Sequence, residues 1–386
     1  MKKFCLNISV SGLAILFLLA SYAPSRLLAG ETYDIGVLLP LTGYREAIGT
    51  MEKQAFELAA EKFNQEAGNH DRQLNLVFID SAATPETAVR EVGRVLEEKG
   101  KSLRMLTGGC SSPAAWAVAK YAQQQQIPFL ISTASSRRIT GQNWNYIFRL
   151  GPPEEEYFLE PIARAIQDAG EYKSAAIIYE NSICTTETAR RLKQLCGRLK
   201  LDLSIWYGYR PGRKNFKRLG ELLAEKQPEI LLLAGRSSEA GIILSRCREM
   251  ESPPALVFGC SPDFSRPEMW DIAGENAEGL KTVVLWKDFL PYAGAAEFAR
   301  EYKLNFAKDP DYHAAEAYAS LEIIADVFSR AQTFSRDELR DLLAATEMTT
   351  VFGPVRFISD SRYTNQNRLA GHLLQWHEGV LETVDH

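Results

Sequence analysis

Residues 103–125 read LRMLTGGCSSPAAWAVAKYAQQQ: a short, mostly apolar run, a loop of small residues, and a longer periodic segment. The run 103–107 is brief and ends at two glycines, which predicts a strand. The segment 113–125 opens with a proline and repeats apolar residues at helical spacing, which predicts a helix. A strand that passes directly into a helix is typical of parallel sheets.

The same strand–loop–helix pattern recurs along the chain, with one interruption at 148–157, where FRLGPPEEEY brings a glycine and two prolines together. Alternating strands and helices require parallel sheets covered on both faces. Two such blocks predict an α/β fold with two doubly wound parallel-sheet lobes. Ligands of such sheets bind beyond the carboxyl ends of the strands, so the loops after each strand are the candidate sites. We expect strands at 34–39, 74–80, 103–107, 129–132, 175–179, 203–207, 230–233, 256–258, 280–286, 354–358 and 372–376. We expect helices at 50–67, from 84 onward, and at 113–125, 186–199, 215–225, 239–248, 295–306, 314–329 and 336–345.

The composition restricts the classes of function. The 386 residues carry 44 Lys and Arg against 49 Asp and Glu, for a formal net charge of −5 at pH 7. An acidic chain lacks the basic face that nucleic-acid binding needs, so we expect no nucleic-acid partner. The five histidines show no catalytic spacing, and neither G-x-S-x-G nor H-E-x-x-H occurs. We therefore predict a protein that is not an enzyme and uses no cofactor or metal.

The first thirty residues have the pattern of a secretory signal peptide. Lys2 and Lys3 precede the uncharged run LAILFLLA at 13–20, and small residues such as Ala29 and Gly30 follow. The run is too short to span a bilayer, which takes about 20 residues. We predict that 1–30 is a signal peptide and that the mature protein is periplasmic; the alternative is an anchor that is never cut.

Five cysteines remain after residue 30, an odd number that leaves at least one thiol unpaired in a monomer. Export permits disulfides. The nearest pairs in sequence are Cys184 with Cys196 and Cys247 with Cys260, and the sequence leaves both pairings open.

The loop from Gly108 to Pro113 has the features of an anion site. Its glycines allow a close backbone approach, and we expect Ser112 to be the N-cap of a helix whose first position is Pro113. The unpaired N–H groups and the positive end of the helix dipole suit a carboxylate, and Ser111 adds a hydroxyl. The alternative is an ordinary capped helix without a ligand.

A second polar loop follows the next predicted strand. Residues 132–136 read STASS, which places four hydroxyls in five positions. They can complete a polar cradle with Ser111, whereas the alternative is a solvated turn.

Several segments stand in a characteristic order along the chain: IGVLLPLTG at 35–43, GGCSS at 108–112, IPFLISTASS at 127–136, FRLGP at 148–152, IAGENAEGL at 272–280 and GPVRF at 353–357. This ordered set resembles the type I periplasmic solute-binding proteins of ABC importers, and more narrowly their leucine/isoleucine/valine-binding family. The resemblance implies two α/β lobes joined by three hinge crossovers. It places 31–150 plus 278–370 in the first lobe, and 151–277 plus 371–386 in the second.

The resemblance also implies roles for individual residues. Ser111, with Ser112 in the same loop, matches the serine that binds the α-carboxylate of the solute. The Ala134 carbonyl and the Ser136 hydroxyl match the groups that take the α-ammonium, with Ser135 between them. An acid from the second lobe assists in the family, and Asp263 is the acid of this chain that lies near that position.

Other positions depart from the family pattern. Tyrosines that the family often places around the ligand are replaced by Ile48, Cys184 and Arg236. A buried Arg236 would favour a second acidic group on the solute, whereas an Arg236 that turns to solvent would not. Glu180 closes another predicted strand and is a candidate for the wall of the second lobe.

These observations predict an exported receptor that captures an amino acid or related small carboxylate in a cleft between the lobes. It would act as a monomer and deliver the solute to an ABC permease in the membrane. The alternative is a periplasmic sensor that reports the solute to a membrane partner without transport.

Overall fold

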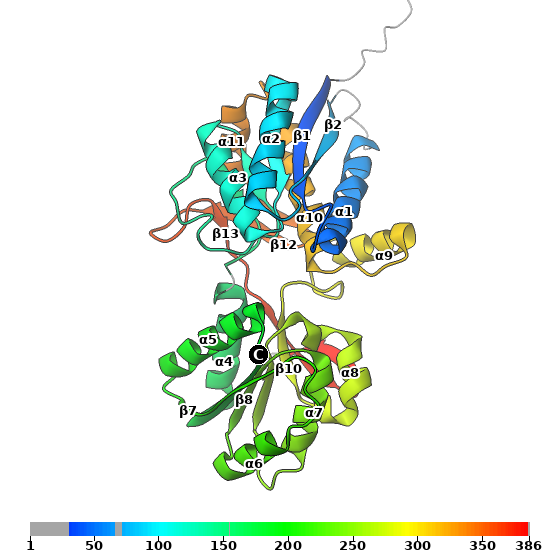
Figure 1. The fold of residues 1–386 in the computed structure, drawn as a ribbon. Coiled ribbons are helices and arrows are strands. Elements are labelled where there is room, and N and C mark those ends of the chain that lie inside the picture. The colour runs from blue at the N-terminus through cyan, green and yellow to red at the C-terminus, as the bar shows by residue number, and fades with distance from the viewer. Residues whose placement is uncertain (1–30, 66–71, 154, 385–386) are drawn as a thin grey trace, which may run out of the picture.

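Two sheets, each at the centre of one lobe, organise the molecule (Figure 1). The computed structural model describes residues 31–65, 72–153 and 155–384, so the predicted signal peptide at 1–30 lies outside the described residues. Both sheets are mostly parallel and carry helices, which confirms the predicted fold class.

The first sheet has the strand order β11-β12-β13-β5-β4-β3-β1-β2 within the described residues. The strands from β2 to β5 pair in parallel, while β11, β12 and β13 add an antiparallel edge. Its strands are β1 (Glu31–Leu39), β2 (Arg72–Asp80), β3 (Leu103–Gly108), β4 (Phe129–Ile131), β5 (Ile147–Arg149), β11 (Glu347–Thr350), β12 (Gly353–Ile358) and β13 (Gln366–Asn367). Its helices are α1 (Glu46–Gln65), α2 (Pro85–Lys99), α3 (Ser112–Gln124), α9 (Ala295–Phe306), α10 (Tyr312–Arg330) and α11 (Arg336–Ala344).

Alternation along β1 shows how this sheet is buried on both faces. Ile35 and Val37 join the core formed with α1, α9, α10 and α11, whereas Leu38 packs with α2 and α3 on the other side. Successive side chains of a strand point to opposite faces. A continuous apolar strand therefore requires helices on both sides.

The second sheet has the order β15-β14-β10-β9-β8-β6-β7 in the part of the chain that the structure describes. Helices α4 and α5 cover one face, and α6, α7 and α8 cover the other. Its strands are β6 (Ser174–Glu180), β7 (Asp202–Tyr209), β8 (Ile230–Ala234), β9 (Leu256–Gly259), β10 (Lys281–Val284), β14 (His372–His377) and β15 (Val380–Thr383). Its helices are α4 (Glu160–Ala169), α5 (Ile183–Arg198), α6 (Lys217–Lys226), α7 (Ser237–Arg248) and α8 (Pro267–Ala273).

One predicted lobe boundary is wrong. We placed 278–370 in the first lobe, but β10 pairs with β9 and β14 in the second sheet. Its apolar side chains explain the position, because Val283 and Leu280 are buried in the two cores of the second lobe. The crossover therefore follows Val284. β5 and β13 belong to the first sheet, and β6 and β14 to the second.

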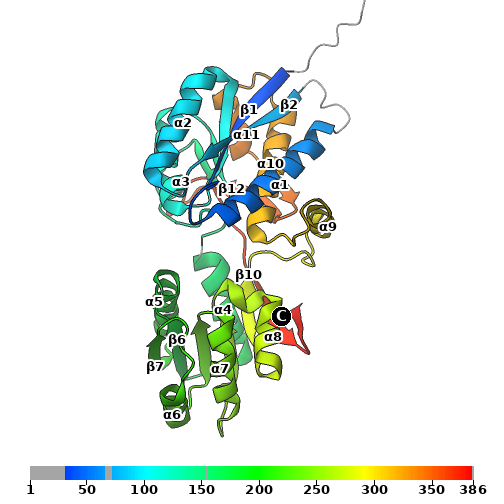
Figure 2. The same cartoon turned by 45° about the vertical axis from the view of Figure 1, so that its right-hand side comes forward.

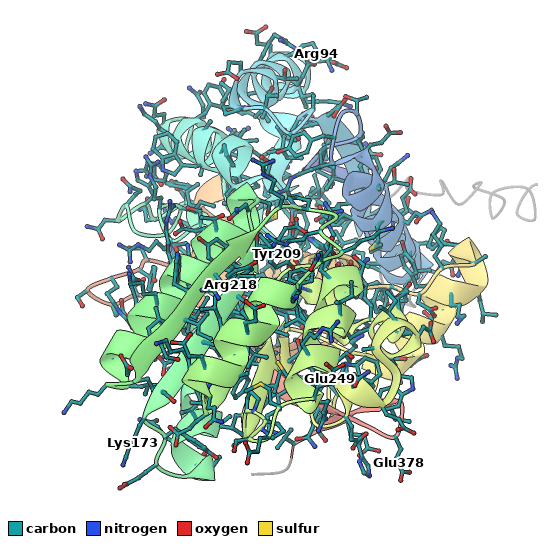
Figure 3. All side chains as sticks on the ribbon, turned by 60° about the horizontal axis from the view of Figure 1, so that its bottom comes forward. Arg94, Lys173, Tyr209, Arg218, Glu249 and Glu378 are labelled. Atoms are coloured by element: carbon teal, nitrogen blue, oxygen red, sulfur yellow. The ribbon has the colours of Figure 1, made fainter. Side chains whose placement is uncertain are left out.

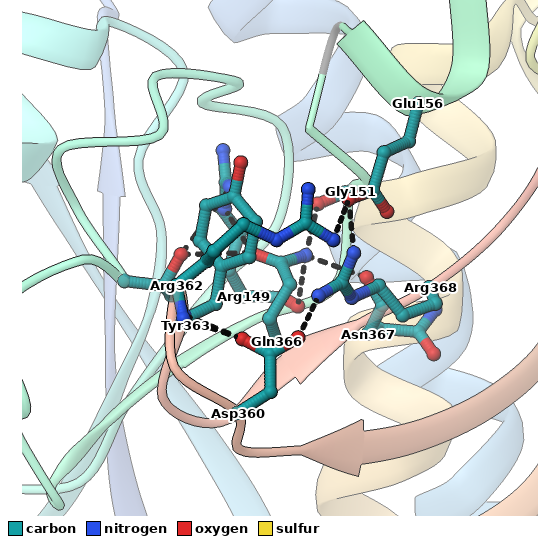
Figure 4. Close-up of polar contacts among 10 residues, drawn as sticks. Arg149, Gly151, Glu156, Asp360, Arg362, Tyr363, Gln366, Asn367 and Arg368 are labelled. Carbon is teal, nitrogen blue, oxygen red and sulfur yellow. Dashed lines mark hydrogen bonds and ion pairs between the residues drawn. The ribbon is translucent and has the colours of Figure 1, made fainter. Parts of the chain in front are cut away.

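The crossover segments are tied to one another and to the first lobe. Arg368 donates to Glu156 of the first crossover and to Asp360, the latter at 2.6 Å (Figure 4). The Gln366 side chain donates to the Gly151 carbonyl at 2.9 Å. These polar contacts connect the first crossover, which follows residue 150, to the third, which lies near residue 370.

Neither of the two cysteine pairings that the sequence leaves open forms a disulfide. Cys196, Cys247 and Cys260 are buried free thiols, and the side chain of Cys184 lies outside the described residues. Cys184 and Cys196 both lie within α5, twelve residues and about 18 Å apart along the axis, which exceeds the reach of a disulfide. Cys247 and Cys260 belong to cores on opposite faces of the second sheet.

The outer surface of the second lobe mixes both signs of charge. Figure 3 shows Lys173 and Arg218 together with Glu249 and Glu378 spread over that end of the molecule. None of the helices in the described residues combines the length and apolarity that a membrane span requires.

Candidate functional site

A cavity of about 690 Å³ lies between the two lobes. The second lobe contributes Glu180, the last residue of β6, and residues that follow β8 and β9, among them Arg236 and Asp263. The crossover after β10 contributes Lys287, and the loop before α10 contributes Asp311. The cavity therefore meets the carboxyl edge of the second sheet, where ligands of parallel sheets bind.

The wall of the second lobe centres on an acid and a base. The Glu180 side chain is 4% exposed, and its Oε2 lies 3.4 Å from Nε of Arg236, whose side chain is 62% exposed. Burial raises the pKa of the Glu180 carboxyl, and the Arg236 charge opposes that shift. Gly235 allows the close packing below, because a Cβ there would lie 2.1 Å from the Tyr209 hydroxyl.

The loop after β3 differs in detail from its prediction. The N-cap of α3 is Ser111, not Ser112, and the helix begins at Ser112. The Ser111 side chain makes no cap hydrogen bond, because its hydroxyl donates to the Ala83 carbonyl at 3.2 Å. Gly108 and Gly109 have φ of +90° and +88°. Their close approach is to β1, since the Gly109 N–H donates to the Leu38 carbonyl at 2.7 Å.

The loop after β4 is bound to the same helix. The Ser136 N–H donates to the Ser112 hydroxyl at 3.3 Å, which joins the two predicted ligand loops. Below them Arg149 is fully buried and donates to the Ala134 carbonyl at 3.4 Å and to Gln366 at 2.7 Å (Figure 4). Burial lowers the pKa of the Arg149 guanidinium to about 10.

Two buried acids lie behind these loops, and the sequence did not reveal them. Glu52 of α1 accepts a hydrogen bond from the Thr133 hydroxyl at 2.9 Å, and Glu316 of α10 packs against Gly151. Burial raises the pKa of Glu52 to about 7, although the nearby His313 lowers it. Burial also raises the pKa of Glu316 well above its usual range. Each occupies an ordinary position of an amphipathic helix, so the pattern gave no signal of its role.

A sequence model of the periplasmic binding protein family matches residues 32–379. This chain belongs to that family. Leu/Ile/Val-binding protein homolog 3 of Brucella melitensis is 25% identical over 248 residues, which cover 64% of this chain and 65% of that protein. The leucine-, isoleucine-, valine-, threonine- and alanine-binding protein of Pseudomonas aeruginosa is 20% identical over 372 residues, or 94% of each chain.

The solved structures agree on the fold. An ABC transporter substrate-binding protein from Sphaerobacter thermophilus superposes with a TM-score of 0.73 at 20% identity, covering 92% of this chain and 97% of that one. The predicted resemblance to type I periplasmic binding proteins is confirmed. The family is a solute-binding class.

The cavity includes some of the predicted site residues of this periplasmic binding protein. Arg236 and Asp263 line it, as does Glu180. Arg236 lines the cavity and its side chain is 62% exposed, so of the two alternatives left open by the sequence the buried arginine does not hold. The lining does not include Ser111, Ser112, Ala134, Ser135, Ser136 or Ile48. The side chain of Cys184 lies outside the described residues.

The floor of the cavity comes from the crossover and the start of α10. Asp311 caps α10 by accepting from the His313 N–H at 2.9 Å. Burial raises the pKa of Asp311, but its contacts with His313 outweigh burial and leave the value below its usual range. Lys287 donates to the Ser265 carbonyl at 2.9 Å, which links the crossover to the second lobe.

The arrangement suits recognition of a polar solute. The cavity presents charged groups of both signs beside the aromatic rings of Tyr157 and Tyr312. Within the described residues, no three His, Cys, Asp or Glu side chains are placed to hold one metal ion.

Proposed function

We propose that this chain is an exported receptor that captures an amino acid or a related small carboxylate between its lobes and delivers it to an ABC-type permease. The observation that carries the proposal is the cavity of about 690 Å³ that residues of both lobes and of a crossover line together. That volume lies in the range of small-molecule sites. The names of the Brucella and Pseudomonas relatives support an amino acid as the solute.

The first lobe would hold the carboxylate at the N-terminus of α3, whose residues lie outside the cavity lining and would join it when the lobes close. The first-turn amides of a helix have no partners within the helix and face the positive end of its dipole. Ser111 and Ser112 begin this turn, and Ser136 is bonded to Ser112, so the two loops form one polar edge. Ser135, the Ala134 carbonyl and Asp263 of the second lobe would then surround the ammonium.

Closure of the lobes would couple binding to delivery. A solute that touches both lobes binds the closed form more tightly and shifts the population toward it. Shifting a ratio of 1:99 to 99:1 takes about 5.5 kcal/mol, and a micromolar ligand provides about 8 kcal/mol in total. A receptor of ordinary affinity can therefore drive closure.

Titration calorimetry of the purified mature protein against amino acids and small organic acids tests the proposal. We expect at least one carboxylate to bind at micromolar concentration or below, and its decarboxylated amine to bind at least tenfold more weakly. A panel in which no carboxylate binds contradicts the proposal.

Growth and uptake experiments separate transport from sensing. Deletion of the gene should abolish high-affinity uptake of the solute identified by calorimetry, and a plasmid copy should restore it. Normal uptake in the deletion strain together with a lost transcriptional response would favour a sensor. Sequencing of the N-terminus of the protein from a periplasmic extract checks export and cleavage near residue 30.

A further inference from the structure

Glu180 is a buried carboxyl on the cavity wall with an unsatisfied oxygen. Its residue is 3% exposed, and Oε2 has no hydrogen-bond partner among the described residues. The same residue lines the cavity between the lobes. A buried polar atom without a partner is costly, so such atoms in native proteins need an explanation.

The neighbours of Glu180 are already engaged elsewhere. Glu239 accepts from the Gly212 N–H at 2.7 Å and from the Ser238 hydroxyl. Ser261 donates to the Gly235 carbonyl at 2.6 Å. Asp263 adds a further negative charge on the same side. None of these groups donates to Glu180 Oε2 in the part of the chain that the structure describes.

Arg236 is the charged group that faces this carboxyl most closely. Its Nε lies 3.4 Å from Oε2, at a geometry that does not make a hydrogen bond. Its side chain is mostly exposed and lines the cavity. A buried charge is stable only when it is paired and its hydrogen bonds are formed. Here a buried acid lies beside a largely exposed base.

We propose that Glu180 and Arg236 form a subsite for the far end of the solute, and that this end carries a net-neutral polar group with a hydrogen-bond donor and an acceptor side by side. A carboxamide is the simplest such group, and a ureido group shares its chemistry. The donor takes the place of Arg236 Nε at Glu180, and the guanidinium binds the acceptor. The inference deepens the proposed function and rests on it.

The charges of the pair select against other side chains. An acidic end group meets the Glu180 carboxylate, and an ammonium meets the Arg236 guanidinium, so each has one unfavourable neighbour. An aliphatic end group leaves the buried carboxylate without a donor when water is excluded. The site therefore discriminates a carboxamide from an aliphatic group of similar size, because its own polar groups need the partner.

Calorimetry of the full mature chain with L-glutamine, L-citrulline, L-leucine, L-glutamate and L-lysine tests this subsite. We expect the wild type to bind glutamine or citrulline at least tenfold more tightly than the other three. Tighter binding of leucine than of both amides overturns the inference, while it leaves the proposed function intact. Binding of none of the five, with no other carboxylate bound, overturns both.

Two variants locate the recognition. E180Q and R236A should each weaken binding of the preferred amide at least tenfold, and the double variant should lose less than the product of the two single losses, because the two groups act on one end of the solute. Leucine binding should not weaken in either variant, because an aliphatic end group makes no hydrogen bond to either side chain. Unchanged binding of the amide by both variants contradicts the subsite.

A matched control comes from the outer face of the same lobe. Arg246 is half exposed and pairs with Glu249 at 2.7 Å, and neither residue lines the cavity. R246A therefore removes a comparable ion pair and should leave amide binding unchanged. Thermal unfolding of each variant verifies that it is folded. Because R236A alters an exposed side chain, this variant still tests the subsite if E180Q is unstable.

Discussion

The two proposed walls of the ligand site, one from each lobe, share an architecture but differ in their polar contacts. Both are carboxyl edges of mostly parallel sheets with glycines where a strand ends: Gly108 is the last residue of β3 and Gly109 follows it, and Gly235 follows β8. In the first lobe the polar groups of the loops bind one another, as Ser111 does with Ala83. Within the described residues, buried oxygens without a partner occur in both lobes: on Ser132, Glu52 and Glu316 in the first lobe, and on Glu180 in the second. Of these four residues only Glu180 lines the cavity, so the unsatisfied oxygen that faces the solute belongs to the second wall.

The difference indicates a division of labour between the lobes. A loop whose hydrogen bonds are internal loses little entropy when it binds, so it suits a group common to many solutes, such as a carboxylate. A buried acid that lacks a hydrogen-bond partner, beside an exposed base, suits the part that distinguishes one solute from another. Variants of the first wall and variants of the second wall should therefore differ in their effects on stability and on solute binding.

The largest effect on the first wall should come from Glu52, in the dependence of stability on pH. Its pKa in the folded protein is raised to about 7 from a usual 4.5. The native state thus holds this proton more tightly than the unfolded chain, and stability falls as pH rises from about 4.5 to about 7. One pKa unit is worth about 1.4 kcal/mol. The free energy of unfolding of E52Q should therefore rise by about 3 kcal/mol relative to that of wild type as the pH increases from 4.5 to 8.

Urea denaturation of E52Q and wild type at both pH values measures this shift. Gln keeps the acceptor for the Thr133 hydroxyl and removes the charge. E46Q alters an exposed acid in the first turn of the same helix and is the matched control. A difference in the free energy of unfolding between E52Q and wild type that does not change with pH would falsify the raised pKa of Glu52.

The sequence predicts the repeated strand–helix units well because each is a local pattern. The apolar alternation of β1 and the cap at Thr84, which accepts from the Thr87 N–H, need no distant information. The crossover after β10 was misplaced because a short apolar strand fits the core of either lobe. Partner choice depends on β9 and β14, which lie far away in sequence.

At the candidate site, too, the sequence predicts local features but not contacts between distant residues. The loops after β3 and β4 were recognised from glycines and hydroxyls in sequence, and Glu180 from its place at the end of a strand. Direction was not predictable: the Ser111 hydroxyl turns to Ala83, and Arg149, 15 residues after Ala134, supports that carbonyl from below. Glu316 is buried by contacts between α10 and the loop at Gly151, which no local pattern encodes.

An intermediate effect is expected from Gly235, which packs beneath the second wall. In G235A the new methyl group would lie 2.1 Å from the Tyr209 hydroxyl, and Tyr209 is itself buried against Phe216. Overpacking of this kind costs about 1–3 kcal/mol. We expect urea denaturation to show a loss of about 2 kcal/mol, with amide binding weakened because Glu180 shifts.

Gly197 in α5 provides the comparison for that variant. A Cβ there meets no atom within 4 Å, so G197A should leave stability unchanged or raise it by up to about 1 kcal/mol. Equal stabilities of G235A and G197A would show that Tyr209 moves aside at little cost and that the second wall is not closely packed at residue 235.

The smallest effect should come from Ser111, and it separates two ways of holding a carboxylate. Its hydroxyl donates to the Ala83 carbonyl, so S111A should lower the free energy of unfolding by about 1 kcal/mol. If the amides of α3 hold the carboxylate, solute affinity should change less than threefold, because the backbone is unaltered. Paired denaturation and calorimetry measure both quantities. A loss of affinity of tenfold or more at unchanged stability would mean that the hydroxyl leaves Ala83 and turns to the solute when the lobes close, and the first wall would then be as adaptable as the second.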